Sequence, residues 1–593
     1  MVIETLIKPN VYYDSLVLMH LSSSLLKQPG VYKAVVMMGT DENRATVKDK
    51  ELLTNAVLEA NPNDLFIVIA AESEPAAKAA IAQAVDYLEN KRGEDAGDVL
   101  SYKTLEAALQ NTPAANLVSI SLPGKYAGGE AQRALEAGLH VFLFSDNVPL
   151  QEELNLKQLA ASKKRLLMGP DCGTAILGGA ALGFANAVRK GSIGIVGASG
   201  TGIQEVTTLI HRLGAGISHA IGTGTRDIGP DVNGVTLIAG LEWMARDPQT
   251  NVILIVSKPP SPSARGKILA IVRQLEKPVV VNLLGSSAED YQGSNIYLAE
   301  TMEDAARMAV WLDRGHREDA SHLALYQQEE LKRLAAAEHS QLKPGQTCYR
   351  GLFSGGTFAN EAAMLLKGSL HEVYGNISLP GIQPLKDPFT SIQHTCVDMG
   401  DDIFTVGKPH PILAPSLRRE RMLAEAADPS TAVIYLDIVL GYGCHPDPAT
   451  EFVEFIGEAK ALAAKGGRHL PIIAYVAGVD EDPQNYTAQV EALQRGGALV
   501  SPTNAAAARL AVGILTGHYP EATPLALHDF KRPTGSLCEE LPFDLPERAN
   551  IINVGLNAFA DSLKQQQVPV THIDFHPPAG GNEAMARLLA DML

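Results

Sequence analysis

Uninterrupted apolar runs of strand length constrain the fold of this chain more than any other feature of its sequence. Residues 192–200, 251–260 and 432–443 stay mainly apolar on successive positions instead of alternating with polar residues. A strand of this kind must be covered on both faces, as in a parallel sheet between two layers of helices. Similar runs occupy residues 33–40, 64–71, 116–124, 140–147, 278–285 and 471–478.

Stretches with helical spacing of apolar residues lie between these runs. Each of them ends near a glycine or a proline, as helix C-termini do. The clearest are residues 130–139, 202–214, 267–276 and 360–368. Strands that alternate with helices in this way predict an α/β, multidomain protein with several doubly wound sheets.

The chain is long enough for several such domains, since it has 593 residues. A polar helical segment at 313–346 separates two apolar blocks that share one plan, and this plan predicts a duplicated flavodoxin-like domain. An aperiodic stretch at 517–549 precedes a last βα-like segment. We therefore expect boundaries that give an N-terminal α/β domain at 1–110, a second unit at 111–190, the two repeats at 191–335 and 345–516, and a linker with a C-terminal βα segment at 517–593.

The charge balance limits the classes of partner. Lys and Arg total 49 against 67 Asp and Glu, which gives a net charge of −18 at pH 7. An acidic chain is a poor match for nucleic acid or a membrane surface. No signal peptide is recognisable, no apolar stretch reaches about 18 residues, and five widely spaced cysteines indicate a reducing compartment. We expect a soluble, cytoplasmic protein, and the charge balance leaves room for a local basic pocket that binds a small anion.

Two glycine-rich turns at the start of predicted helices are the strongest candidate binding sites. Such turns expose backbone N–H groups and the positive end of the helix dipole, which suit an anion such as phosphate. The first turn holds Gly197, Ser199, Gly200, Thr201 and Gly202, and the second holds Ser354, Gly355, Gly356 and Thr357. The alternative is that glycine only permits a tight turn, and that the second turn is an inherited copy without a ligand.

A loop at 400–422 carries the densest group of polar side chains. Asp401 and Asp402 precede Lys408 and His410 in a turn made rigid by glycine and proline, and Arg418, Arg419 and Arg421 follow. These residue types suit anion binding and proton transfer, although a solvated loop with a basic helix face has the same composition. Lys258 and His445 end equivalent strands, where sites in α/β proteins usually lie, but each could be a surface turn residue.

Two further patterns are weaker. Cys172 follows a strand in the segment MGPDCGTAI and could be a nucleophile, but a cysteine there is more often a packed apolar residue. His572, Asp574 and His576 alternate along a predicted strand, which can make a metal site but more often marks a polar strand face. We expect no metal.

Several motifs resemble the α-subunit of succinyl-CoA synthetase and the NDP-forming acyl-CoA synthetases. They are FSDNV at 144–148, MGPDCGT at 168–174, GASGTGIQE at 197–205 and HAIG at 219–222. The likeness covers residues 114–315, and residues 347–516 resemble a second ligase-type domain. It implies a Rossmann-like CoA-binding-type segment at 111–190 and succinyl-CoA-synthetase-type domains at 191–335 and 345–516.

The full length is similar to the FdrA family through VMMGT at 36–40, VSKPP at 256–260, SGGT at 354–357, GDDIFTVGKPHP at 400–411 and PAGGN at 578–582. This resemblance implies a subunit of an oxamate carbamoyltransferase. Such an enzyme would convert oxalurate and phosphate to oxamate and carbamoyl phosphate in allantoin and purine nitrogen catabolism. It would act in a hetero-oligomer with other carbamoyltransferase subunits.

On that hypothesis the two glycine turns hold phosphate and carbamoyl oxygens, Arg226, Lys258 and Lys408 clamp anionic oxygens, and His410 donates the proton. The few cations near these positions must then create a local field against the overall negative charge.

Departures from the ligases leave other functions open. The ligases carry a phosphohistidine in a GHAGA-type loop, but neither SSAEDYQGSN at 286–295 nor VDEDPQNY at 479–486 contains histidine. The CoA-type glycine loop is also missing from the N-terminal strand, so CoA is only a weak cofactor prediction. One alternative is an acyl-CoA-synthetase-like protein that binds CoA esters or acts as a non-catalytic scaffold. Another is a residual ligase that uses His410 or His445.

Overall fold

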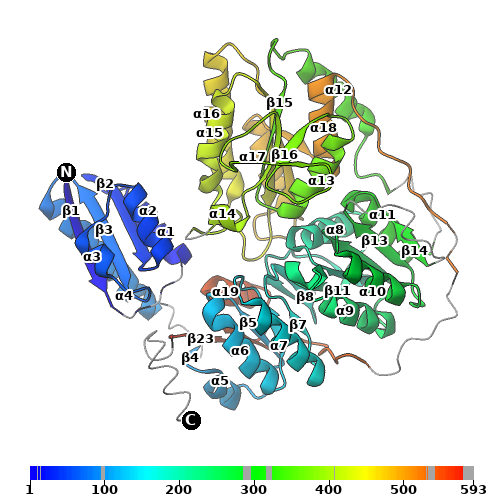
Figure 1. The fold of residues 1–593 in the computed structure, drawn as a ribbon, viewed down its shortest axis with the longest axis horizontal. Coiled ribbons are helices and arrows are strands. Elements are labelled where there is room, and N and C mark those ends of the chain that lie inside the picture. Colours follow the sequence, from blue (N-terminus) through cyan, green and yellow to red (C-terminus); the bar gives the residue numbers. More distant parts are fainter. Residues whose placement is uncertain are drawn as a thin grey trace.

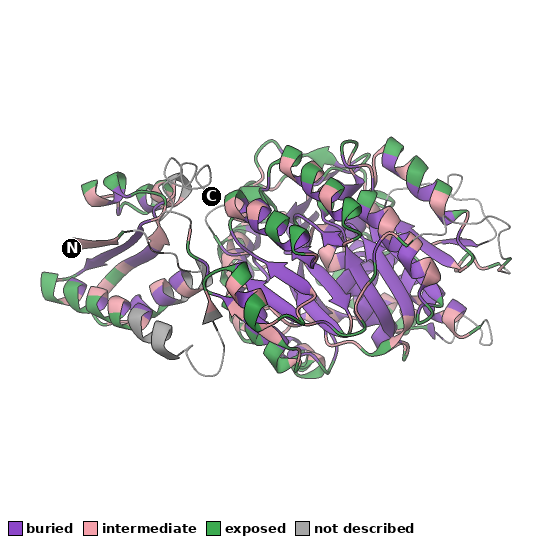
Figure 2. Cartoon of the chain, turned by 90° about the horizontal axis from the view of Figure 1, so that it is seen from below, coloured by how far each residue is buried: buried purple, intermediate pink, exposed green. Residues whose placement is uncertain are grey.

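A computed structural model describes residues 1–9, 11, 13, 15–94, 101–284, 295–315, 323–405, 408–528, 530–531 and 541–577. They form four sheets with helices packed on them, so the predicted α/β, multidomain fold is confirmed (Figure 1). Figure 2 shows the strands of the larger sheets as the buried layer between helices that are exposed on their outer sides. No helix in the described residues combines the length and the apolar character that crossing a membrane requires.

The N-terminal unit is a small sheet of order β1-β3-β2, in which both pairs are antiparallel. Its elements are β1 (Val2–Lys8), α1 (Ser15–Leu25), β2 (Val31–Met38), α2 (Asp41–Asp49), α3 (Asn55–Glu59), β3 (Leu65–Ala71) and α4 (Glu74–Glu94). The apolar runs at 33–40 and 64–71 are strands, but a parallel sheet is wrong for them. Helices α1 and α4 cover one face and α2 and α3 the other, so an antiparallel sheet is also buried on both sides.

A second sheet, of order β4-β23-β22-β5-β6-β7, is parallel throughout. Its strands are β4 (Ser101–Tyr102), β5 (Leu117–Ile120), β6 (His140–Leu143), β7 (Leu167–Met168), β22 (Ile551–Val554) and β23 (Val570–Ile573). Its helices are α5 (Leu105–Asn111), α6 (Gly124–Glu136), α7 (Leu150–Ser162) and α19 (Asn557–Gln565). The C-terminal βα segment therefore completes the sheet that the segment after residue 100 begins.

The third sheet has the order β14-β13-β12-β10-β11-β8-β9, and the antiparallel pair β8 and β9 extends its parallel part. Its strands are β8 (Thr174–Leu177), β9 (Ala180–Gly183), β10 (Lys190–Gly197), β11 (Ile217–Gly222), β12 (Val252–Ser257), β13 (Val279–Leu283) and β14 (Ile296–Leu298). Its helices are α8 (Gly200–Arg212), η1 (Thr225–Ile228), α9 (Val235–Arg246), α10 (Pro262–Val272) and α11 (Met302–Asp313). The segment predicted as 111–190 thus gives strands to two sheets.

The fourth sheet has the order β17-β16-β18-β15-β19-β20-β21 and is parallel. Its strands are β15 (Cys348–Phe353), β16 (Val373–Gly375), β17 (Gln383–Pro384), β18 (His394–Asp398), β19 (Thr431–Val439), β20 (Ile472–Ala477) and β21 (Leu499–Ser501). Its helices are α12 (Gln328–His339), α13 (Gly356–Lys367), α14 (Asp402–Thr405), η4 (Pro415–Arg418), α15 (Arg419–Ala427), α16 (Pro448–Lys465), α17 (Tyr486–Arg495) and α18 (Asn504–Thr516).

The third and fourth sheets repeat one topology. In the first of these sheets the strands β10 to β14 lie side by side in the order β11-β10-β12-β13-β14, so the second strand in the chain flanks the first on one side and the third flanks it on the other. The strands β15, β18, β19, β20 and β21 have the same arrangement, and β16 and β17 extend the sheet beyond β18. This is the flavodoxin-like order that the duplication requires. We refer to the two units as the first repeat and the second repeat.

Two buried glutamates join the repeats, because each of them caps the last helix of the other repeat. Glu205 on α8 of the first repeat accepts a hydrogen bond from the backbone N–H of Asn504, the first residue of α18 in the second repeat, at 3.3 Å. Glu361 on α13 of the second repeat accepts one from the N–H of Met302, the first residue of α11 in the first repeat, at 2.6 Å. Both glutamates are fully buried. A carboxyl group at a helix N-terminus receives orphan N–H groups and complements the helix dipole.

Burial also changes the protonation of this pair. It raises the pKa of Glu205 to about 8, with the neighbouring Glu361 adding to the shift, and it raises the pKa of Glu361 to about 7. The folded protein therefore retains protons that the unfolded chain releases above the ordinary glutamate pKa of 4.5. Stability falls as the pH rises from that value through about 8.

We predict that Glu205→Gln reduces this loss of stability. The amide keeps an oxygen for the N–H of Asn504 but does not ionise. Between about pH 5.5 and about pH 8.5, a range that spans the raised pKa, the melting temperature of the variant should therefore fall several degrees less than that of the wild type. Thermal unfolding at a series of pH values measures this. Glu491→Gln on the surface of α17 is the control. Parallel curves for Glu205→Gln and wild type would contradict the prediction.

Candidate functional site

The carboxyl ends of the first strands of the two repeats meet. Strand β10 runs into the turn at 197–202 and α8, and β15 runs into the turn at 354–357 and α13. The hydroxyl oxygens of Ser199 and Thr357 lie 2.5 Å apart across this junction. In open α/β sheets, ligands bind at this edge, where the strand order reverses. The two turns that the sequence singled out therefore form one site.

Glycine is required where the turns touch. A side-chain carbon added at Gly355 would lie 2.7 Å from the methyl carbon of Thr201, and one at Gly202 would lie 3.1 Å from the methyl carbon of Thr357. At both positions the helices approach too closely for a larger residue. Part of the glycine content thus serves packing, as the alternative interpretation of these turns anticipates.

Each helix still presents N–H groups at its N-terminus. In α8 the Ser199 hydroxyl caps the N–H of Gly202 at 2.9 Å, while Gly200 and Thr201 occupy the first two positions, which have no acceptor within the helix. Helix α13 has no side-chain cap, so Gly356 and Thr357 are in the same situation. These four residues are partly or fully buried, with Gly200, Thr201 and Gly356 retaining solvent contact.

An internal carboxylate occupies the remaining donors of the second turn. Asp437 on β19 accepts hydrogen bonds from the N–H groups of Ser354 at 2.7 Å and Gly355 at 2.9 Å, and from the Ser354 hydroxyl at 2.7 Å. The buried Arg418 guanidinium pairs with the same carboxylate at 2.7 Å and lies 4.6 Å from the centre of the Phe452 ring. Ser354, Gly355 and Arg418 are therefore committed to the protein itself.

Lys258 and Asp398 lie against the start of α13. A side-chain carbon added at Gly356 would be 2.4 Å from Asp398 Oδ2 and 3.3 Å from Lys258 Nζ. Lys258 directly follows β12 and is partly buried, and no hydrogen bond or ion pair within the described residues engages its ammonium group. Of the three predicted anion clamps, Lys258 is the one that reaches the paired helix N-termini.

Asp398 ends β18, and one of its two carboxylate oxygens is hydrogen-bonded. Its Oδ1 accepts the N–H of Gly400 at 3.0 Å, and its backbone N–H and C=O bond to the side chain of Asn376, each at 2.8 Å. Burial raises the pKa of Asp398 to about 6, and the charge of Lys258 opposes the rise. The residue is 9% exposed. It was not among the residues predicted from the sequence.

The loop after β7 forms a third wall. The backbone N–H of Asp171 bonds to the carbonyl of Ser145 after β6, at 2.9 Å, and burial raises the pKa of the Asp171 carboxyl although Lys258 acts in the opposite direction. A side-chain carbon at Gly224 would lie 2.0 Å from the carbonyl oxygen of Pro170, so this loop touches the turn that follows β11. Burial raises the pKa of Cys172 to about 12, which supports the packed thiol and not the nucleophile.

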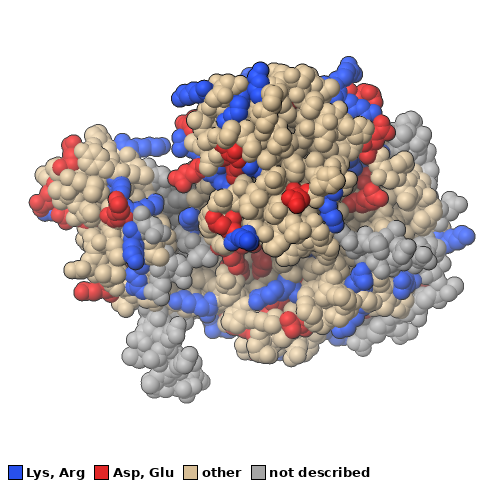
Figure 3. Space-filling view, turned by 45° about the horizontal axis from the view of Figure 1, so that its top comes forward, with Lys and Arg blue, Asp and Glu red and all other residues tan. Residues whose placement is uncertain are grey.

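The site is richer in carboxylates than in cations. Repulsion from the carboxylates of Asp146 and Asp402 also raises the pKa of Asp171, and repulsion from Asp401 raises the pKa of Asp398. The expected cations are used elsewhere. Arg226 pairs with Glu153 at 2.9 Å, Arg419 with Glu458 at 2.7 Å and Arg421 with Glu425 at 2.6 Å, while Lys408 is exposed. Figure 3 shows basic and acidic side chains interspersed over the face in view. The local field expected from gathered cations stays a prediction.

His410 lies beside the site in a neutral form. Burial and the charge of Arg418 lower its pKa to about 4. Its Nδ1 accepts the N–H of Ile412 at 3.3 Å, which places the proton of the neutral ring on Nε2, and a side-chain carbon at Gly400 would lie 2.7 Å from Nε2. The ring centre is 5.7 Å from that of Phe184. Its predicted role as proton donor stays a prediction, as do the other catalytic roles.

The remaining candidates lie apart from the site. His445 pairs with Glu451 at 3.3 Å, and His572 lies 3.0 Å from the Asn553 amide. No group of three or more His, Cys, Asp or Glu side chains in the described ranges is arranged to hold a metal ion. The PAGGN motif and most of the SSAEDYQGSN segment lie outside the described residues.

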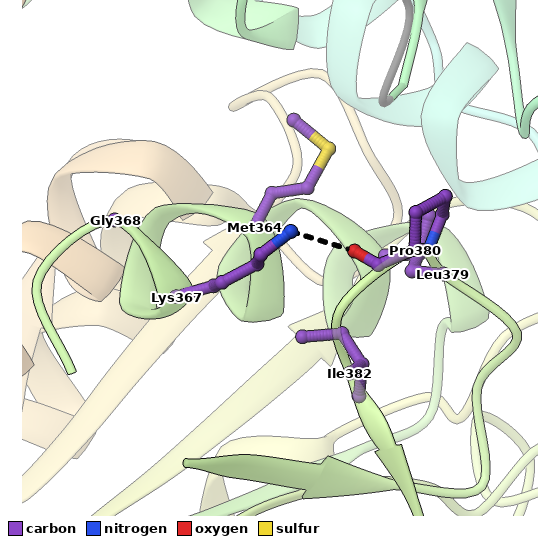
Figure 4. A pocket seen from close by; sticks show the side chains of 6 residues that line it. All are labelled: Met364, Lys367, Gly368, Leu379, Pro380 and Ile382. Atoms are coloured by element: carbon purple, nitrogen blue, oxygen red, sulfur yellow. Dashed lines mark hydrogen bonds between the residues drawn. The ribbon is translucent and has the colours of Figure 1, made fainter. Parts of the chain in front are cut away.

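A pocket of about 340 Å³ lies at the other end of α13 (Figure 4). Its lining is Met364, Lys367, Gly368, Leu379, Pro380 and Ile382. The Lys367 ammonium donates to the Pro380 carbonyl at 2.8 Å. Because the paired turns lie at the N-terminus of this helix, the pocket is not part of the site.

Three protein families match parts of the chain. The family described as AllF, heavy metal-associated domain, matches residues 1–103, the CoA binding domain matches 188–283, and the CoA-ligase family matches 352–514. The CoA binding match therefore falls on the segment predicted as the first ligase-type domain. Both CoA-related matches contain one of the paired turns.

Named relatives agree with this result. The α subunit 1 of the ADP-forming succinate–CoA ligase of Archaeoglobus fulgidus is 27% identical over 38% of this chain and 79% of its own length. The corresponding α subunit of Aquifex aeolicus is 28% identical over 33% of this chain and 65% of its own length. The acyl-CoA-synthetase-like part of the predicted resemblance is confirmed, and membership of the FdrA family stays a prediction.

The expected enzyme class is wrong. The CoA-ligase family and the succinate–CoA ligases that match the chain are not carbamoyltransferases, so carbamoyl phosphate and allantoin catabolism lose their support. The alternative of an acyl-CoA-synthetase-like protein fits the matches better. A longer match is the uncharacterized protein YahF of Escherichia coli strain K12, which is 42% identical over 85% of this chain and 97% of its own length. Parts of the chain are similar to α subunits of succinate–CoA ligases, and the chain belongs to the family of YahF.

Proposed function

We propose that this protein binds a CoA thioester and carries out an acyl transfer of the CoA-ligase type at the paired helix N-termini. The observation that carries the proposal is the contact between Ser199 and Thr357, which brings the N-termini of α8 and α13 together beside Lys258. The CoA binding match and the CoA-ligase match each contribute one of these turns, which supports the same assignment.

The charge of the site selects the form of the substrate group. Asp171, Asp398 and Asp402 would repel a phosphate dianion, and Lys258 offsets only part of their charge. A thioester carbonyl is neutral, so it enters without this repulsion. Negative charge then develops on its oxygen in the tetrahedral transition state, where N–H donors and an ammonium group stabilise it most.

The residues divide the work on this proposal. The N–H groups of Gly356 and Thr357 and the Lys258 ammonium face the developing oxyanion. The N–H groups of Gly200 and Thr201 form the opposite wall and orient the acyl group. His410 is neutral and holds one proton on Nε2, so it can hydrogen-bond the substrate without adding charge.

A non-catalytic scaffold is the second candidate function. It is favoured by the absence of histidine from both loops that correspond to the phosphohistidine loop of the ligases, and by the tight packing of Gly355 on Thr201. A scaffold would bind the CoA ester without turning it over. The assays below distinguish it from an enzyme.

We predict that Gly356→Ala weakens the binding of acyl-CoA. The added methyl would press on Asp398 Oδ2 and approach Lys258 Nζ, and thus fill the space where the carbonyl would lie. Calorimetric titration with acetyl-CoA and succinyl-CoA should show at least a tenfold (order-of-magnitude) weaker affinity than for the wild type. Gly368→Ala, at the C-terminal cap of the same helix, is the matched control because a methyl there meets only the Leu365 carbonyl, at 3.5 Å. Equal affinities of both variants would exclude this location.

We predict that Lys258→Gln lowers turnover more than it weakens binding, because the ammonium faces charge that develops in the transition state. The rate at which labelled succinate exchanges into succinyl-CoA should fall by about a hundredfold or more, the order expected for the loss of one oxyanion donor. Lys267→Gln on the exposed surface of α10 should match the wild type. Wild-type protein that binds succinyl-CoA without any exchange would support the scaffold.

A further inference from the structure

We propose that Asp398 is the covalent acceptor of this site and that the protein moves CoA from one carboxylic acid to another. The inference rests on the proposed function, since it requires a bound CoA thioester. It adds the chemical class of the reaction, a CoA transfer between carboxylates. It also names the side chain that forms the intermediates.

Asp398 has the geometry of a carboxylate nucleophile. The Gly400 N–H fixes Oδ1 at 3.0 Å, and Asn376 anchors the backbone on both sides, so the side chain is pre-oriented. Within the described residues no hydrogen bond engages Oδ2, which lies against the start of α13 on the side that also faces Lys258. The N-terminus of α13 therefore brings together hydrogen-bond donors for a developing oxyanion and an unengaged carboxylate oxygen that can act as the nucleophile.

The fold does not require a carboxylate at this position. Asp398 pairs with Phe353, and Phe353 precedes the first residue of α13 by three positions. In the first repeat the corresponding strand residue is Gly222, which pairs with Gly197, three positions before the first residue of α8. The same strand end is thus built with glycine in one repeat and with aspartate in the other, so the aspartate serves the site and not the sheet.

The neighbouring carboxylates are less suited to the role. Asp402 is exposed at the start of a single-turn helix, and the Asp171 carboxyl accepts a hydrogen bond from the Thr225 side chain. Both are close enough to affect the ionisation of other groups in the site, but neither lies at the N-terminus of α13. Asp398 alone among these three combines burial, an anchored oxygen and an unengaged one.

The chemistry balances without a nucleotide or phosphate. Oδ2 of the ionised Asp398 attacks the thioester carbonyl, the C–S bond breaks, and the products are an acyl-aspartyl anhydride and CoA thiolate. The thiolate then attacks the aspartyl carbonyl, which releases the substrate acid as a carboxylate and leaves Asp398 as a CoA thioester. A second carboxylate reverses the two steps and leaves with the CoA, so no proton or electron is gained or lost overall.

The test uses the full chain with succinyl-CoA as the probe and no added nucleotide or phosphate. Borohydride reduces an enzyme-bound thioester to an alcohol, so peptide mass spectrometry of the treated wild type should find homoserine in place of Asp398. Labelled acetate should enter acetyl-CoA when succinyl-CoA is the donor. The exchange should rise as the pH increases through about 6, because the carboxylate is the reactive form.

Asp398→Asn should bind succinyl-CoA with an affinity within about threefold of the wild type but lose the borohydride product and at least about a hundredfold of the exchange rate. Asp561→Asn, on the exposed face of α19, should retain both. Binding by the wild type without any reduced Asp398 would overturn this inference and leave the proposed function standing. A wild type that does not bind succinyl-CoA or acetyl-CoA would overturn both. The reduction of the wild type gives this answer even if Asp398→Asn does not fold.

Discussion

The structure depends on the reciprocal capping of α18 by Glu205 and of α11 by Glu361. Each flavodoxin-like repeat ends on a helix whose first N–H group bonds to a buried glutamate of the other repeat, while the repeat's own threonine, Thr301 or Thr503, caps the N–H two positions later. Separating the repeats would therefore leave the N–H groups of Met302 and Asn504 without these acceptors and would expose two buried carboxyl groups. Because Glu205 and Glu361 lie on α8 and α13, the same contact fixes the two helices whose N-termini form the site.

The two turns are related by the repeat but differ in what satisfies them. In the second repeat, Asp437 on β19 accepts hydrogen bonds from the N–H groups of Ser354 and Gly355. The corresponding residue of β12, judged by the same pairing with the first strand, is Val256, which has no carboxylate to offer. The first turn uses its own Ser199 hydroxyl instead. Only the outermost N–H groups remain for a ligand, so the site is smaller than two full glycine turns would suggest.

Much of the fold was accessible from the sequence because its signal is local. Continuous apolar runs such as 192–200 and 251–260 became strands buried on both faces, and the turns between strands and helices were found from glycine and serine. The return of β22 to β5 was not predictable, since the contact of Asn550 with Asn116 joins residues 434 positions apart. No local pattern carries such information.

The residues of the candidate site were likewise predictable only where a local sequence pattern marks them. Lys258 was found because it ends a long apolar strand, whereas Asp398 ends β18, a five-residue strand of mixed composition that gives no such run. Asp437 lies within the apolar run at 432–443, and that pattern indicates only a position in the core. A charge within such a run needs a buried partner, but the sequence does not identify that partner as Arg418.

The overall charge of −18 and the local charge of the site lead to one conclusion. A site for free phosphate should gather cations, but Arg226, Arg418, Arg419 and Arg421 neutralise carboxylates within the protein. Among the residues that the structure describes, one ammonium group, that of Lys258, remains beside the helix N-termini, among several aspartates. This arrangement stabilises negative charge at one atom without attracting a dianion. It therefore suits a neutral carbonyl that becomes an oxyanion during reaction, and the nearby carboxylates are available as reactants.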